Sequence, residues 1–131
     1  MTTFRIGEAA ELLGVSPDTV RRWIDSGRLA ATRAEQGQRS ITGADLAAFA
    51  RDRAAAPDAG AGSSSARNRL RGIVTAIVKD QVMAQVDLQV GPFRVVSLMS
   101  REAVDELGLE VGSLATAVVK STNVVVERLD H

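Results

Sequence analysis

The spacing of apolar residues predicts two short helices at the start of the chain. The apolar positions of the first helix are Ile6, Ala9, Ala10 and Leu13. They repeat at helical intervals, and Gly14 after them is a natural stop. The second helix starts at Ser16, whose hydroxyl can cap it, and Gly27 closes it. Two short helices joined through Gly14 match the helix-turn-helix pattern.

The second helix has one apolar and one polar side. Its apolar stripe is Val20, Trp23 and Ile24, so we expect Trp23 in the core rather than exposed for stacking. The side turned away from the core carries Thr19, Arg21, Arg22 and Asp25.

A small hairpin and a third helix are predicted next. Two short segments flank the turn at residues 35–38, with Arg33 and Arg39 on either side of it. The third helix is capped by Thr42 or by Gly43, and its apolar positions include Leu46 and Phe49. Helices and a small wing make the N-terminal half mainly α.

The chain changes character in the middle. Residues 54–65 contain only Ala, Pro, Gly, Ser and one Asp, so they offer no large apolar side chain to bury. A gap of this length is longer than most connections inside a compact domain. We therefore expect two domains, 1–54 and 65–131, joined by a flexible linker over residues 55–64.

The C-terminal half reads mostly as strands. A short helix is expected from its N-cap Ser100 to Gly108. The five apolar or alternating stretches are 70–80, 82–91, 93–99, 112–120 and 123–129. Five short strands with one short helix suggest a small β-barrel of the oligonucleotide-binding (OB) class.

Composition excludes several classes of protein. The chain has 131 residues, no cysteine, and a single histidine at position 131, so it offers no thiolate or histidine metal site and no catalytic triad. We therefore do not expect the protein to be an enzyme. No apolar run approaches the length of a membrane span and no signal peptide is evident, which favours a cytoplasmic protein. The formal net charge is zero, so DNA binding would require a local basic patch.

Residues 4–52 resemble the MerR-like and excisionase-like winged helix-turn-helix families, from "IGEAAELLGVSPDTVRRWIDSG" to "ITGADLAAF". The resemblance implies double-stranded DNA as a partner, with the second helix in the major groove and the wing on the backbone or minor groove. The residues that the resemblance assigns to DNA are Ser16, Thr19, Arg21, Arg22, Arg33 and Arg39. The alternative is that the arginines among them are only solvated surface residues.

Residues from Ser65 to about Glu127 resemble the Mop domain of molbindins, which is related to TOBE domains. The motifs are "SARN" with a Leu-x-Gly step after it, and "GSLATAVVKSTNV" near the end. The resemblance implies molybdate or tungstate as ligand, bound between subunits. MerR-type proteins usually continue into a long dimerising helix, which this chain lacks, so we expect self-association through the C-terminal domain, as a dimer or a hexamer.

Carried onto this chain, the resemblance gives an oxyanion site that is rich in hydrogen-bond donors. Molybdate is a dianion, so it needs donors and is repelled by carboxylates, and the stretches concerned contain no Asp or Glu. The assigned residues are Ser65, Arg67, Ser97, Ser100, Lys120, Ser121 and Thr122. Lys120 interrupts a valine-rich strand, and as a buried cation it would need an anionic partner. The alternative is that Lys120 reaches solvent from a strand end and that the serines cap turns.

The two halves together predict a molybdate- or tungstate-responsive transcription regulator. A storage or buffering protein for the oxyanion is one alternative. An excisionase-like architectural factor, in which the barrel serves only for oligomerisation, is the other.

Overall fold

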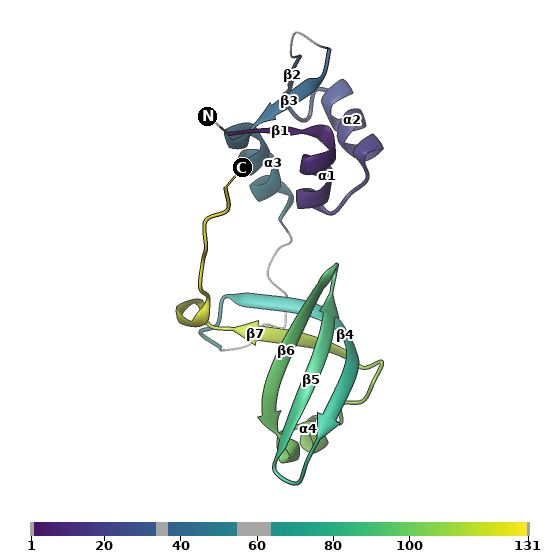
Figure 1. Ribbon diagram of the computed structural model, residues 1–131, viewed down its shortest axis with the longest axis vertical. Helices are drawn as coiled ribbons and strands as arrows, with labels where there is room; N and C mark the ends of the chain where they lie inside the picture. The colour runs from purple at the N-terminus through teal and green to yellow at the C-terminus, as the bar shows by residue number, and fades with distance from the viewer. Residues whose placement is uncertain (1, 34–36, 55–63, 131) are drawn as a thin grey trace. The chain divides into compact units, whose positions relative to one another are not determined.

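The computed structural model describes residues 2–33, 37–54 and 64–130 and separates into two compact units (Figure 1). The first comprises Met1–Ala56 and Leu129–His131, and the second comprises Pro57–Arg128. The N-terminal unit is mainly helical. The C-terminal unit is an antiparallel sheet with one short helix, which confirms the expected fold class for both halves.

The N-terminal unit contains the expected helices and wing. The helices are α1 (Ile6–Leu13), α2 (Pro17–Asp25) and α3 (Gly43–Arg53). Thr42, not Gly43, is the N-cap of α3, because its side chain accepts a hydrogen bond from the Asp45 N–H at 3.1 Å. The wing pairs β2 (Thr32–Arg33) with β3 (Arg39–Thr42). Residues 35 and 36 of its expected turn lie outside the described residues. A further strand, β1 (Thr3–Arg5), pairs with β3 and was not predicted.

A small core holds the N-terminal unit together. Its buried residues are Ala9, Ala10, Val20, Leu29, Ile41 and Leu46. Trp23 packs against this cluster, with its ring 4.9 Å from that of Phe49, so its expected place in the core is confirmed. The Arg53 guanidinium covers the Trp23 ring at 4.9 Å, a cation–π contact at the edge of the core.

The C-terminal unit is built on one long strand. Its strands are β4 (Asn68–Lys79), β5 (Met83–Val90), β6 (Phe93–Ser100) and β7 (Leu114–Val119), in the order β6-β5-β4-β7. The first half of β4 pairs with β7 and the second half with β5. Helix α4 (Arg101–Leu107) follows β6, and a 3-10 turn, Ser121–Asn123, follows β7.

Gly72 lies where β4 changes partner. A Cβ atom at this position would overlap the Gln89 carbonyl oxygen of β5 and would approach Val90 Cγ2 to 2.9 Å. Only glycine allows the two strands to come this close. Two residues further along β4, the register of its pairing with β5 shifts between Val74 and Ala76. The shift helps β4 to pair with β7 over its first half and with β5 over its second half.

One face of this sheet is covered and the other is open. Val74, Val86 and Leu88 form the buried cluster together with Val104 of α4. The strand register places Ile73, Val78, Val96 and Leu98 on the opposite face, where they are exposed. On that face Asp87 is nearly buried and pairs with Arg94 at 2.7 Å. The hydrogen bond from Arg94 holds the pKa of Asp87 below its usual value.

The fifth strand expected at 123–129 is wrong for the single chain, and the sheet does not close into a barrel. Residues 124–130 have no regular structure, and Val125 and Val126 are 87% and 86% exposed. A strand forms only by pairing, and within the described residues β6 and β7 each have one neighbouring strand. The apolar tail and two open sheet edges are therefore present together.

Candidate functional site

Helix α2 presents its arginines to solvent and keeps its apolar stripe inside. Ser16 caps the helix, with its Oγ accepting from the Thr19 N–H at 3.2 Å and lying 2.9 Å from Thr19 Oγ1. Arg22 donates to the same Thr19 hydroxyl at 3.2 Å, and Arg21 pairs with Asp18 at 2.6 Å. Both arginines lie on the exposed side of α2 that sequence analysis assigned to DNA.

The wing arginines face each other across the hairpin. Arg33 and Arg39 are direct partners in the β2–β3 register. Arg39 also reaches Asp25 at the end of α2, with Nη1 and Oδ1 2.7 Å apart, and is only 26% exposed. This residue therefore connects the wing to α2, a structural role that the sequence did not predict.

Arg5 is a further basic residue that sequence analysis missed. It lines an open pocket of about 390 Å³ together with Arg21 and Arg39. Its sequence position, in a strand of three residues before α1, gave no sign that the wing would fold next to it.

Five of the seven oxyanion candidates lie at one end of the C-terminal sheet. Asn68 pairs with Val119, and its side-chain N–H donates to the Val119 carbonyl at 3.0 Å. This pairing brings the start of β4 and the end of β7, which the 3-10 turn Ser121–Asn123 follows, to the same end of the sheet. We call this group the donor cluster: Ser65, Arg67, Lys120, Ser121 and Thr122.

The donor cluster is open to solvent in the single chain. All five side chains are exposed, so the expectation of a buried Lys120 is wrong for an isolated subunit. Arg67 donates to the Ser65 carbonyl at 3.1 Å, which orders the start of β4. Arg69, two residues after Arg67, was not predicted as a site residue. Its Nε is buried and has no hydrogen-bond partner in the described residues. No Asp or Glu occurs in 64–72 or 114–126.

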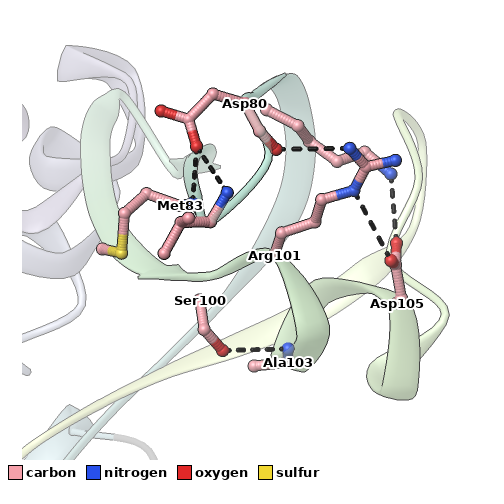
Figure 2. Close-up of polar contacts among 8 residues, drawn as sticks. Asp80, Met83, Ser100, Arg101, Ala103 and Asp105 are labelled. Carbon is pink, nitrogen blue, oxygen red and sulfur yellow. Dashed lines mark hydrogen bonds and ion pairs between the residues drawn. The ribbon is translucent and has the colours of Figure 1, made fainter.

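Ser97 and Ser100 lie elsewhere, on β6. Ser100 is paired with Met83, next to the far end of β4, and caps α4 by accepting from the Ala103 N–H at 3.1 Å (Figure 2). Ser97 pairs with Val86 in the middle of β5. Strand β4 spans 12 residues, which is about 40 Å of extended chain. One chain therefore does not bring the seven residues together.

The region around Ser100 also carries acidic groups, as Figure 2 shows. Asp80 accepts hydrogen bonds from the backbone N–H groups of Val82 and Met83, both at 2.7 Å, which lowers its pKa. Arg101 donates to the Asp80 carbonyl and pairs with Asp105 at 3.8 Å. Acidic residues therefore lie close to Ser100, unlike in the donor cluster.

The described residues contain no group of three or more His, Cys, Asp or Glu side chains that could hold a metal ion. None of the helices in that part of the chain combines the length and the apolar character needed to cross a bilayer.

Comparison with known proteins identifies both halves. Residues 3–54 match the family model described as a helix-turn-helix domain, and residues 64–126 match the TOBE domain. Neither family description names a catalytic activity. Molybdenum-pterin-binding proteins 3 and 2 of Clostridium pasteurianum are 43% and 45% identical over 65 residues, which is 49% of this chain and 96% of each relative.

One solved structure of a relative was obtained with molybdate bound. The cytoplasmic molybdate-binding protein ModG is 40% identical, with a TM-score of 0.48, and the match covers 52% of this chain and 49% of that chain. The C-terminal half of the chain therefore belongs to the Mop family of TOBE-domain proteins, and a helix-turn-helix domain precedes it in the same chain.

Proposed function

We propose that the protein is a transcription regulator that binds double-stranded DNA with its N-terminal unit and molybdate or tungstate with its C-terminal unit. The observation that carries the proposal is the donor cluster of a Mop-family domain in the same chain as a helix-turn-helix domain. A regulator of this kind acts where DNA is, so the proposal places the protein in the cytoplasm.

The chemistry of the donor cluster suits a tetrahedral dianion. Two cations and three hydroxyls lie at this end of the sheet, from Ser65, Arg67 and 120–122, and their local stretches contain no carboxylate. A charge-assisted hydrogen bond contributes about 1.5–3 kcal/mol, so a few of them provide substantial affinity. Ser97 and Ser100 complete the proposed site from a neighbouring subunit, since the same chain holds them elsewhere.

Self-association through the C-terminal unit is part of the proposal. Val124, Val125, Val126 and Leu129 are exposed, and three of them are β-branched residues that favour strands. Open edges β6 and β7 offer unpaired backbone groups. We infer that the tail of one copy adds a strand to the sheet of another, in a dimer or a hexamer.

The oxyanion site is tested by calorimetric titration of the full chain with molybdate, tungstate, sulfate and phosphate. We expect molybdate and tungstate to bind, because they share shape and charge. Sulfate has shorter bonds and phosphate keeps a proton, so both should bind poorly. Lys120→Ala should lower the molybdate affinity at least tenfold, about 1.4 kcal/mol.

The matched control is Lys79→Ala, which removes the only other lysine of the chain, one that is already paired with Asp105 at 3.2 Å. It should leave the molybdate affinity unchanged. If the wild-type protein binds molybdate and tungstate no more tightly than sulfate, the sensor function is wrong.

DNA binding is tested with Arg22→Ala and Arg39→Ala. If Arg22 reads a base edge, its removal should cost about 1–3 kcal/mol on the preferred duplex and less on a random one. Arg39→Ala should weaken both duplexes equally and reduce the salt dependence by about one unit. Removing Arg39 also leaves the Asp25 carboxylate without its partner, and that negative charge would repel DNA. The Asp25→Asn variant breaks the same ion pair but keeps Arg39, so it shows how much of the effect comes from the lost contact alone. Wild-type affinity in both arginine variants would exclude this placement of helix and wing.

Storage of the oxyanion is the second candidate function. It is favoured by relatives that correspond to the C-terminal half alone and by the pairing of Arg21 and Arg39 with acidic residues. Salt-sensitive, sequence-selective DNA binding separates the regulator from a store. Absence of ligand binding together with intact DNA binding would instead indicate the architectural factor.

A further inference from the structure

Three segments that are far apart in the sequence meet at the pocket of about 390 Å³ in the N-terminal unit. Arg5 is the last residue of β1, Arg21 lies in the middle of α2, and Arg39 begins β3 of the wing. The pocket is lined by Arg5, Ile6, Gly7, Arg21, Gly37, Gln38 and Arg39.

Among the described residues, the lining of this pocket is cationic and contains no carboxylate. Asp18 and Asp25, which pair with Arg21 and Arg39, are 86% and 62% exposed and lie outside the lining. A guanidinium has five N–H donors, so one carboxylate leaves most of them available. Arg39 contacts Asp25 through Nη1, and its side chain is still 26% exposed.

Such a pocket suits an anionic group that accepts hydrogen bonds on several sides. A phosphodiester has this chemistry, and the pocket opens between α2 and the wing, the two elements assigned to DNA. Two of its arginines were already candidates for DNA contact; Arg5 was not.

We propose that Arg5, Arg21 and Arg39 form a clamp for one phosphate of the DNA backbone. The inference rests on the proposed DNA-binding function and adds Arg5 as a positioning contact that is independent of base sequence. By fixing one phosphate between α2 and the wing, the clamp sets the depth and angle at which Arg22 meets the groove.

The test is Arg5→Gln in the full chain, measured on a preferred duplex and a random duplex of equal length over a range of salt concentrations. The affinity should fall about tenfold on both, and the slope of log affinity against log salt should decrease by about 0.9. Arg5→Lys keeps the charge and should recover most of the affinity. The matched control is Arg51→Gln, an exposed arginine of α3 outside the pocket lining, which should change neither quantity.

Each outcome separates the clamp from the DNA-binding function itself. If the wild-type protein binds DNA and Arg5→Gln behaves like Arg51→Gln, with both folded by thermal denaturation, the clamp is wrong and the DNA-binding function stands. If the wild-type protein binds neither duplex, the DNA-binding function is wrong as well. Inorganic phosphate should compete no better than chloride at equal ionic strength; specific competition would show a site for free phosphate instead of the DNA backbone.

Discussion

Replacing both Val125 and Val126 with aspartate is expected to convert the protein from an oligomer to a monomer and to abolish tight molybdate binding. Both side chains are almost fully exposed in the single chain, so the change should not unfold the C-terminal unit. Burying the two valines against another copy would contribute roughly 3–6 kcal/mol, and aspartates at the same positions would place unpaired charges in that contact. The association should weaken more than a hundredfold.

Light scattering and sedimentation at micromolar concentration measure this directly, with circular dichroism as the check on folding. Val125→Ile with Val126→Ile is the matched control, because isoleucine keeps the β-branched shape and the apolar character and should preserve the oligomer. A wild-type protein that is monomeric, or an aspartate variant that assembles normally, would show that the tail does not join the subunits.

Gly72→Ala is expected to destabilise the C-terminal unit by about 2–3 kcal/mol, because overpacking between closely spaced strands forces the backbone apart. The added Cβ meets the Gln89 carbonyl oxygen, which is held in the β4–β5 ladder and cannot move away freely. For a domain of this size the corresponding fall in Tm is about 10–20 °C. Because β4 also holds the donor cluster through its pairing with β7, molybdate binding should weaken as well.

Thermal unfolding followed by circular dichroism tests the effect of Gly72→Ala. The control is Gly7→Ala in α1, where an added Cβ meets nothing within 4 Å and alanine favours the helix. A Tm for Gly72→Ala within a degree or two of the wild-type value would mean that β4 and β5 can separate at Gly72 without loss.

Helix boundaries were predictable from the sequence because their signals are local. Ser16, Thr42 and Ser100 each accept a hydrogen bond from the backbone N–H three residues later, which is the contact that makes such residues good caps. Leucine, valine and glycine spacing likewise predicted β4 to β7, since each stretch contains its own alternation.

The features that the sequence did not predict depend on contacts with residues that lie far away in the chain, or on contacts with another copy of it. Strand β1 has three residues, too few to show a period, and exists because β3 pairs with it. The expected strand at 123–129 has no partner among the residues that the structure describes. Arg5 comes close to the wing only through the tertiary fold. Lys120 is exposed because β7, the strand that precedes it, lies at an edge of the sheet.

One chain holds the donor cluster apart from Ser97 and Ser100, so the proposed oxyanion site takes residues from two chains. A binding site built from two chains exists only while the chains are associated, so ligand occupancy rises with more than the first power of protein concentration. Ligand in turn favours the associated state by mass action. The amount of protein in the cell would then set the threshold at which the oxyanion is sensed, and a change in its expression level would shift that threshold without any change in sequence.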